Sequence, residues 1–350
     1  MGPTAAADCP TIVVRVQTLA GQHDQPPHRV SVVIPVYQGE RTLPPLLAEI
    51  AALVDGFTTP DGHVGEVTEA LLVFDHGPDG SAATIRRLAA EHPFVRPVWL
   101  SRNFGQHPAT LAGMASSGGD WIVTMDEDGQ HDPAEIGGML DTALREQATV
   151  VYARPLNGPP HGVLRNAASR GAKRLTELLT GGTDTRYYQS FRLVVGELGR
   201  SVAAYAGSGV YLDVALGWVS GAVATCPVRL RAEDRPSGYR LRTLLSHFWR
   251  MVLTSGTRGL RFVSLLGAAF GALGLALAVF IGVSRLTGGT SPEGWASTVI
   301  IVLLTSGAVL FSLGVVAEYV GVAVNMALGK PAYLIVGDPQ SGPLGRARRQ

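Results

Sequence analysis

Two long uncharged runs near the C-terminus constrain the fold more than any other feature of the sequence. Residues 262–283 and 296–317 each contain 22 amino acids without a charged side chain. A helix of that length spans roughly 33 Å, which is enough to cross a bilayer core. Two buried helices in a soluble domain are the alternative, but uncharged runs this long are uncommon in soluble cores. We therefore expect two membrane helices that form a hairpin.

Basic residues set the expected orientation of this hairpin. The segment that joins the two runs, residues 287–295, contains no basic residue, and only Arg285 lies near it. Basic residues flank the hairpin on its other side, and they are Arg240, Arg242, Arg250, Arg258, Arg261, Lys330, Arg346, Arg348 and Arg349. The positive-inside rule then places both chain ends in the cytoplasm. We expect a protein of the plasma or inner membrane with two spans and its large N-terminal domain in the cytoplasm.

Buried strands alternate with amphipathic helices ahead of the hairpin. Continuous β-branched runs are typical of strands that are covered on both faces. Their alternation with helices predicts an α/β fold with a Rossmann-like, mostly parallel, doubly wound sheet. The expected strands are residues 30–37, 69–75, 95–101, 120–126 and 149–154, and the expected helices are residues 41–54, 81–92, 108–118 and 133–145.

The same patterns divide the chain into segments. Residues 1–29 have no basic start and no continuous apolar stretch, so we expect a mobile tail and not a signal peptide. Residues 241–261 interleave arginine with leucine, phenylalanine and tryptophan, which is typical of a helix at a membrane surface. The expected segments are a tail (1–29), the large domain (30–239), interfacial helices (240–261), membrane helices (262–286 and 296–320), an external loop (287–295) and a cytoplasmic tail (321–350).

Polar residues follow several of the predicted strands. Asp75, the pair Arg102 and Asn103, and the segment 126–128 each come directly after or at the end of one. Ligands of open α/β sheets bind beyond the carboxyl ends of the strands. We therefore expect these residues to converge in space, although they are dispersed in the sequence.

The segment DEDGQ, residues 126–130, has the most distinctive pattern. Asp126 and Asp128 can present two hard oxygens to one divalent cation, and Gln130 can add a neutral oxygen. A solvated turn is an equally good interpretation of this pattern alone. An EF-hand calcium loop is excluded, since it needs other residues at His131 and Gly137. Glu127 and Asp132 are expected to be solvated.

Composition argues against two kinds of partner, nucleic acid and a metal ion bound by cysteines. The formal net charge is only +1, which argues against nucleic acid as a partner. The two cysteines, Cys9 and Cys226, match no metal-ligand spacing and suit a reducing cytosol.

The motifs of residues 30–335, in their order, resemble those of the family 2 glycosyltransferases, which have a GT-A fold. The resemblance is closest to the polyprenyl-phosphate glycosyltransferases, the branch that is similar to dolichol-phosphate mannose synthase. The motifs are SVVIPVY (31–37), FDHGPDGS (74–81), LSRNFGQ (100–106), DEDGQ (126–130), SFRL (190–193), RAEDRPSGY (231–239) and KPAY (330–333).

This resemblance implies a membrane enzyme that transfers a sugar, with inversion, from a UDP- or GDP-sugar to an undecaprenyl- or decaprenyl-type phosphate. It implies Mg²⁺ or Mn²⁺ on the donor diphosphate, held by Asp126, Asp128 and Gln130. Asp128 and Arg192 are the implied catalytic residues. The implied nucleotide-sugar contacts are Pro35, Tyr37, Asp75, Arg102, Asn103 and Asp126, and the implied contacts to the diphosphate or lipid phosphate are Arg231, Arg235, Ser237 and Tyr239.

Several positions depart from the family pattern and leave the donor undefined. His76 stands where a second aspartate is usual, Gln106 where a lysine is common, and Gln189 and Ser190 where Gly-Asp precedes FRL. Two other functions remain as alternatives. A processive polysaccharide synthase would carry a QxxRW motif and more spans, and neither is in the sequence; a catalytically silent membrane scaffold would explain the departures. Gly267, Gly271 and Gly274 permit close helix packing, either within the hairpin or in a homo-oligomer.

Overall fold

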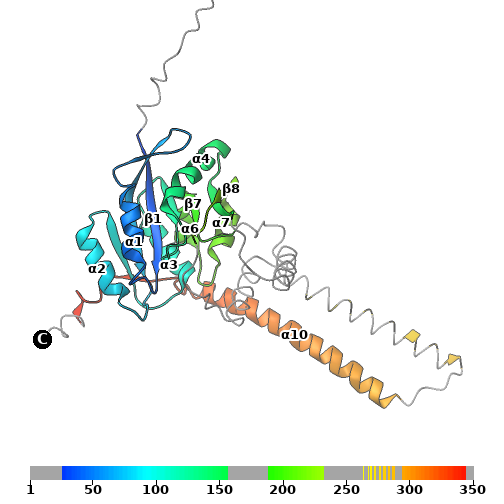
Figure 1. Cartoon of the computed structure of the whole chain (residues 1–350). Coiled ribbons are helices and arrows are strands. Elements are labelled where there is room, and N and C mark those ends of the chain that lie inside the picture. The colour runs from blue at the N-terminus through cyan, green and yellow to red at the C-terminus, as the bar shows by residue number, and fades with distance from the viewer. Residues whose placement is uncertain are drawn as a thin grey trace, which may run out of the picture.

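One mixed sheet and one long projecting helix dominate the structure (Figure 1). The computed structural model describes residues 26–156, 188–231 and 294–343, and isolated positions between 263 and 287. Its strands are β1 His28–Val36, β2 Phe57–Thr58, β3 Val64–Phe74, β4 Val95–Leu100, β5 Trp121–Thr124, β6 Val150–Pro155, β7 Arg192–Val195, β8 Val223–Val228 and β9 Ile335–Val336. Its helices are α1 Leu43–Ala51, α2 Ser81–Glu91, α3 Gln106–Ser116, η1 Pro133–Glu135, α4 Ile136–Glu146, α6 Gly196–Tyr205, α7 Leu212–Val219 and α10 Trp295–Ala327.

The sheet has the order β8-β6-β7-β5-β1-β3-β4-β9, with β2 on β3. The neighbours β5, β1, β3 and β4 are parallel, and so are β6 and β8. Strand β7 runs antiparallel to both β5 and β6, and β9 runs antiparallel to β4. The predicted α/β class and mostly parallel sheet are therefore confirmed, with the reversal at β7 as an addition.

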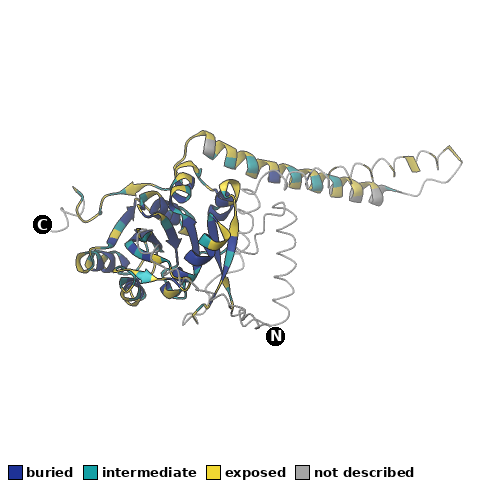
Figure 2. Ribbon diagram, turned by 90° about the horizontal axis from the view of Figure 1, so that it is seen from above, coloured by how far each residue is buried: buried dark blue, intermediate teal, exposed yellow. Residues whose placement is uncertain are grey.

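Helices cover both faces of the sheet, which explains the continuous apolar runs in its central strands. Val32, Val33 and Ile34 of β1 are all fully buried. One apolar cluster packs β1 against α1, α2 and α4, and a second packs the other face against α3, α6 and α7. Figure 2 shows the buried residues concentrated in this central layer. Each fully buried Val or Ile side chain contributes about 1.5–3 kcal/mol.

Helix α3 lies unusually close to the sheet because of one glycine. A Cβ atom on Gly113 would lie 2.3 Å from Val33 Cγ1 and 2.9 Å from Val73 Cγ2. Since real Cβ atoms do not approach so closely, glycine is required where α3 crosses β1 and β3. Helix α3 therefore packs closely against Val33 of β1 and Val73 of β3.

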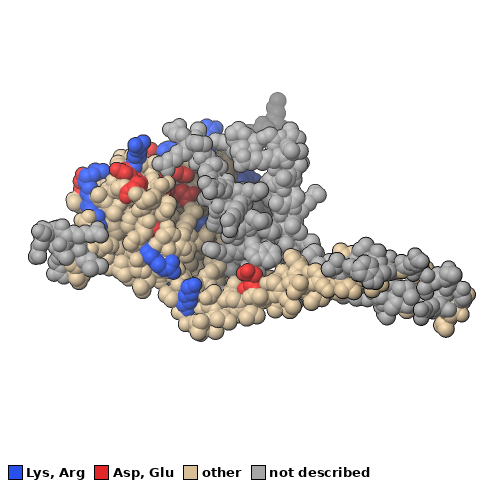
Figure 3. Space-filling view, turned by 90° about the horizontal axis from the view of Figure 1, so that it is seen from below, with Lys and Arg blue, Asp and Glu red and all other residues tan. Residues whose placement is uncertain are grey.

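Helix α10 is long and apolar enough to cross a membrane. Its window Leu304–Asn325 has a mean hydropathy of 1.9 and is almost entirely exposed. Glu318 is the only charged residue in the sequence of α10, and Figure 3 shows the described surface of this helix as nearly all uncharged. It is the one candidate span within the described residues. The predicted hairpin is therefore not confirmed, and its orientation remains a prediction.

Other expected segments lie outside the described residues. They are residues 1–25 of the predicted tail, including Cys9, most of the interfacial and first membrane helices, Gly271 and Gly274, and the predicted phosphate contacts Arg235, Ser237 and Tyr239.

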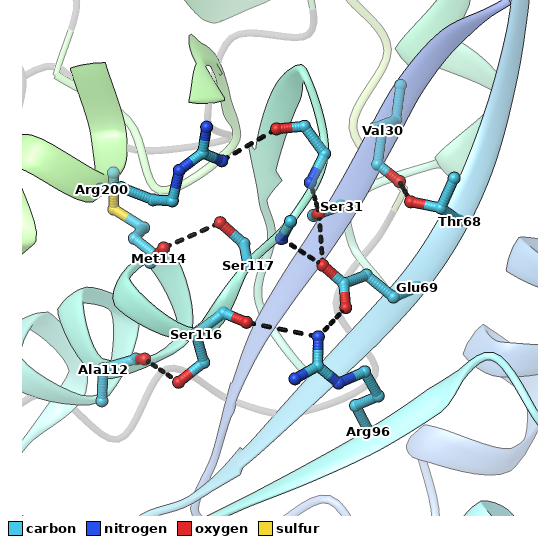
Figure 4. A network of polar contacts seen from close by, with 12 residues as sticks. Val30, Ser31, Thr68, Glu69, Arg96, Ala112, Met114, Ser116, Ser117 and Arg200 are labelled. Carbon is cyan, nitrogen blue, oxygen red and sulfur yellow. Dashed lines mark hydrogen bonds and ion pairs between the residues drawn. The ribbon is translucent and has the colours of Figure 1, made fainter. Parts of the chain in front are cut away.

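Glu69, in the middle of β3, forms the centre of a polar network beside Ser31 of β1 (Figure 4). Its carboxylate is 6% exposed and accepts hydrogen bonds from Ser31 Oγ at 2.7 Å and from the Gly118 amide at 2.6 Å. Arg96 forms an ion pair with it. Burial raises the pKa of Glu69, but these hydrogen bonds and the arginine outweigh burial and leave the pKa below its ordinary value.

The chain that follows α10 returns to the domain and completes the sheet edge. The Ser101 amide donates to Leu334 O at 2.9 Å, and β9 pairs with β4 through Ile335 and Val336. Arg86 binds Asp338 through two hydrogen bonds, of 2.6 and 2.7 Å. The expected tail from residue 321 onward is thus a helix end and an edge strand. Strand β9 was missed because two residues carry too little pattern to predict pairing.

Candidate active site

A cavity of about 430 Å³, here called the donor cavity, lies at the carboxyl ends of β1, β3 and β5. Of the residues predicted to converge, Asp75, Asn103, Asp126 and Asp128 line it and Arg102 does not; Pro35 and Tyr37 line it as well. The remaining lining residues are Val36, Gly105, Gln106 and Glu127. The individual roles of these residues stay predictions.

Asp126 and Asp128 are held by contacts from several loops. Asp126 accepts hydrogen bonds from Gln106 Nε2 and from Ser190 Oγ, both at 2.6 Å. Asp128 accepts one from the Gln130 amide at 3.0 Å. The Asp126 amide in turn donates to His131 Nδ1 at 3.0 Å, and burial lowers the pKa of that imidazole. Gln106 and Ser190, both departures from the family pattern, are therefore direct partners of the first aspartate.

The donor set fits a divalent cation only in part. Asp126 and Asp128 supply two carboxylates on one wall of the donor cavity. Within the part of the chain that the structure describes, no group of three or more His, Cys, Asp or Glu side chains is arranged to hold a metal ion. Mg²⁺ is commonly bound by one or two carboxylates together with substrate phosphates and waters. These two residues would suit a cation of that kind.

Glu127 differs from its expected place in solvent. Its Oε2 accepts a hydrogen bond from the Tyr37 amide and its Oε1 one from the Gln38 amide, both at 2.8 Å. Burial, followed by repulsion from Asp79 and Asp126, raises the pKa of Glu127 to about 7, although the two amides oppose the shift. The prediction was wrong because it continued the strand alternation, whereas β5 ends at Thr124.

The loop after β1 is held by side chains from two further positions. Ser81 Oγ accepts a hydrogen bond from the Gly39 amide at 2.8 Å, and Asp79 accepts one from the Glu40 amide at 3.2 Å. Four successive amides, from Tyr37 to Glu40, thus end on side-chain oxygens. The loop that forms one wall of the donor cavity is therefore fixed before any ligand binds.

Asp75 holds the opposite wall of the donor cavity, also by accepting hydrogen bonds from backbone amides. It is 4% exposed and accepts hydrogen bonds from the amides of Phe104 at 2.7 Å and Gly105 at 2.8 Å. Burial raises the pKa of Asp75. The neighbouring His76 has a φ of 53° and its Nε2 lies 2.6 Å from Leu100 O. Asp75 and His76 together shape the loop that carries Asn103.

Arg192 is enclosed beneath the site. Its side chain is 3% exposed, forms an ion pair with Asp213, and donates through Nε to Thr124 Oγ1 at 3.1 Å. Thr124 donates to Ser190 O at 2.6 Å, and Ser190 contacts Asp126. Arg192 and Asp126 both line a second cavity of about 210 Å³, here called the middle cavity. The described contacts of Arg192 favour positioning of Asp126 over a direct contact with phosphate.

Two other predicted arginines lie outside the donor cavity. Arg102 lines a different cavity, with its guanidinium carbon 4.1 Å from the centre of the Phe104 ring. Arg231 forms ion pairs with Glu49 and Asp132, each at 2.8 Å. Asp132 also accepts a hydrogen bond from the Ala134 amide at 2.9 Å, and its side chain is still 31% exposed, as a residue in the turn before the next helix.

Comparison with known proteins places this site in a family. Residues 31–198 match the family Glycosyl transferase family 2. These residues are therefore similar to a family 2 glycosyltransferase domain, and the enzyme class predicted from the sequence, glycosyltransferase, is confirmed.

Two named relatives align with most of the length of this chain. The undecaprenyl-phosphate 4-deoxy-4-formamido-L-arabinose transferase of Edwardsiella ictaluri is 29% identical over 311 residues, which are 87% of this chain and 93% of that protein. The protein of the same name from Klebsiella pneumoniae (strain 342) is 28% identical over 314 residues, which are 89% of this chain and 93% of that protein. Among solved structures, glucosyl-3-phosphoglycerate synthase from Mycobacterium tuberculosis with Mn²⁺, UDP and phosphoglyceric acid has a TM-score of 0.47 and 20% identity, covering 66% of this chain and 78% of its own.

Proposed function

We propose that the protein transfers one sugar from a nucleotide-diphosphate sugar to a polyprenyl phosphate in the plasma or inner membrane. One observation carries the proposal: a pair of aspartates lines a cavity in a domain that is joined to a helix long and apolar enough to cross a membrane. The undecaprenyl-phosphate transferases that resemble this chain along most of its length support the same acceptor class. Both chain ends lie in the cytoplasm in this proposal.

The donor occupies the donor cavity in this proposal. Pro35 and Tyr37 contact the base, and Asn103 lies on the opposite wall. Asp126 and Asp128, with Gln130, hold Mg²⁺ or Mn²⁺ on the diphosphate. Such a cation, when bound, neutralises charge on the departing diphosphate. Because Glu127 and Asp75 already fix both walls, the donor meets a preformed site and little ordering is left for binding.

The acceptor phosphate is the nucleophile. Its second pKa is about 6 for phosphate monoesters, so it is largely ionised at neutral pH and needs no strong general base. One phosphate oxygen attacks the anomeric carbon, the bond from that carbon to the diphosphate oxygen breaks, and the nucleoside diphosphate leaves with the electron pair. In-line attack inverts the anomeric centre. Arg192 holds the strand ends below Asp126, and the protein contributes chiefly by positioning the two substrates.

Radiolabelled donors test the proposal directly. Membranes that contain the full chain are incubated with polyprenyl phosphate and each of several UDP- and GDP-sugars. We expect a lipid-extractable product with a single sugar from one donor, and loss of that product when EDTA removes divalent cations. A long polymer would favour a processive synthase instead. Absence of product with every donor would favour a membrane scaffold.

A further inference from the structure

The middle cavity adjoins the donor cavity beside the first aspartate of the DEDGQ motif. Gln106 and Asp126 line both cavities. In the proposed function Asp126 holds a cation on the donor diphosphate, and the sugar of such a donor is bonded directly to the second phosphate. A sugar whose diphosphate lies at Asp126 therefore has the middle cavity within reach.

The size and the lining of the middle cavity suit a single sugar ring. Its volume is about 210 Å³, whereas sites that take drug-sized ligands enclose roughly 300–1,000 Å³. Thr110, Tyr188, Gln189 and Tyr211 line it and carry hydroxyl or amide groups. Such groups both donate hydrogen bonds to sugar hydroxyls and accept them. The cavity thus offers neutral polar partners to a sugar.

The permanent charges around the middle cavity are unfavourable for an anionic sugar. Among its described lining residues, Arg192 is the only lysine or arginine, and Asp126 and Asp213 are the carboxylates. Arg192 forms an ion pair with Asp213, and each of the two side chains is only 3% exposed. A carboxylate on the sugar would therefore leave water without gaining an unpaired cation as its partner, which is costly.

The ion pair between Arg192 and Asp213 is held on both sides. Arg192 Nε donates to Thr124 Oγ1 at 3.1 Å, and Tyr152 Oη donates to Asp213 Oδ1 at 3.0 Å. Burial lowers the pKa of Arg192, but the charge of Asp213 outweighs burial and leaves this pKa above its ordinary value. Separating the members of a buried ion pair is strongly unfavourable. Arg192 therefore stays charged and stays with Asp213.

We propose that the buried pair of Arg192 and Asp213 selects donors whose sugar carries no carboxylate. The substrate class is then the neutral hydroxylated sugars and the amino sugars, and the uronic acids are rejected. Asp213 determines this specificity, because it engages the guanidinium that would otherwise bind a sugar carboxylate. This inference rests on the proposed function, since it takes a nucleotide-diphosphate sugar as the donor.

Donors that differ only at carbon 6 of the sugar provide the first test. The pairs are UDP-glucose with UDP-glucuronate and GDP-mannose with GDP-mannuronate, and the pair is chosen whose base matches the labelled donor that gives product. Each member competes with that labelled donor for the full chain in vesicles. We expect the neutral member to compete at least tenfold more tightly than the uronate. Equal or tighter competition by the uronate would overturn the proposal.

Removing the charge of Asp213 provides a second test. Asp213→Asn keeps the shape of the side chain and leaves Arg192 as an unpaired cation, so we expect the preference for the neutral donor to fall at least tenfold through tighter binding of the uronate. The double variant Arg192→Gln with Asp213→Asn removes both charges and should not show this gain. An unchanged preference in folded Asp213→Asn would contradict the assignment.

Glu69→Gln is the matched control for the second test. Glu69 is also a buried carboxylate paired with an arginine, but it lines neither the donor cavity nor the middle cavity. We expect this variant to keep the wild-type preference between the two donors.

Folding and function are checked separately. Circular dichroism shows whether Asp213→Asn is folded, and if it is not, the competition measured on the wild type decides. Failure of the proposed function has its own signature, because the wild type would then form no lipid-linked sugar from any donor. Failure of this inference alone would instead give a lipid-linked uronic acid from the wild type.

Discussion

Alternate side chains of the DEDGQ motif have different surroundings. Asp126, Glu127 and Asp128 all line the donor cavity, and Glu127 in addition binds the amides of Tyr37 and Gln38. A carboxylate that receives two successive amides fixes the direction of the loop that carries them. The motif therefore both lines the donor cavity with carboxylates and holds the loop after β1 in place.

Replacing Asp128 tests the proposed cation site. Asp128→Asn keeps the size of the side chain but removes its charge, and we expect transfer to fall more than about a hundredfold because charge on the leaving diphosphate is no longer compensated. The check is the rate of lipid-linked product formation at saturating donor and acceptor, with circular dichroism as the control for folding. Asp61→Asn, at an exposed carboxylate of the surface pair with Arg145, should leave the rate unchanged. Wild-type activity in Asp128→Asn would refute the assignment.

Replacing Glu127 tests its hold on the loop. Glu127→Ala leaves the Tyr37 and Gln38 amides without their acceptors, so we expect KM for the donor to rise roughly tenfold, the effect of losing about 1–2 kcal/mol. Glu127→Gln retains one acceptor oxygen and should lie between the alanine variant and the wild type. KM for the lipid acceptor, measured in the same assay, should not change. A donor KM of wild-type value in the alanine variant would show that the loop holds its shape without Glu127.

At the scale of elements, the Glu69 network links β1 and β3 to the turn after α3. The folded-state pKa of Glu69 is lowered, so its stabilising contribution is fully present above the unfolded value near 4.5 and is lost as pH falls through the folded value. We expect Glu69→Gln to be less stable than wild type at pH 7 and to lose less stability than wild type on acidification below pH 4.5. Urea unfolding of both proteins at pH 7 and pH 3.5 measures this difference. Parallel acid dependence of the two proteins would contradict it.

An ion pair between Arg86 and Asp338 joins α2 to the chain just after β9. Both side chains are 23% exposed, so the pair is partly shielded from water. We expect Asp338→Ala to loosen β9 and to speed hydrogen exchange of the Ser101 amide, which donates to Leu334 O. Exchange of the Val67 amide, which bonds to Leu53 O elsewhere in the sheet, should not change and serves as the control. Unchanged exchange at Ser101 would mean that strand pairing alone holds the edge.

The alternating elements were predictable because strands of the parallel core contain apolar runs, such as Val32 to Ile34 of β1. The four predicted helices appear as α1, α2, α3, and η1 with α4, with ends that differ by a few residues. The sequence did not predict β7, since three apolar residues after Arg192 do not encode the direction in which a strand runs. The positions of Asp126 and Asp128 at the edge of the sheet could be predicted, because both residues come just after β5 in the sequence. The structural roles of Glu127 and Asp75 could not be predicted, because their partners are backbone amides of loops distant in the sequence.

At the scale of the whole molecule, α10 and the domain form one connected unit. Tyr333 Oη donates to Ala203 O at 3.3 Å, and β9 then joins the sheet, so the chain after α10 is fastened to the domain at several points. A span fixed in this way restricts the height and tilt of the domain above a membrane. Such restriction suits an enzyme whose acceptor lies at a constant depth.

Charge placed within α10 tests whether this helix resides in the bilayer. An arginine at the centre of a span costs about 2.5–3.5 kcal/mol, so we expect Leu313→Arg to reduce the fraction of protein that resists alkaline extraction from membranes. Leu328→Arg, at an exposed position beyond the window Leu304–Asn325, should be extracted like the wild type. Complete extraction of the wild type would rule out α10 as a stable anchor.

The position of β9 after α10 also affects how the chain is made. Strand β4 has a hydrogen-bonding edge that only β9 covers among the described strands. An uncovered edge can pair with another chain and nucleate aggregation. Because the ribosome makes α10 before β9, this edge stays open until the apolar helix has been synthesised. Delayed membrane insertion would therefore prolong the period in which newly made chains can associate through β4.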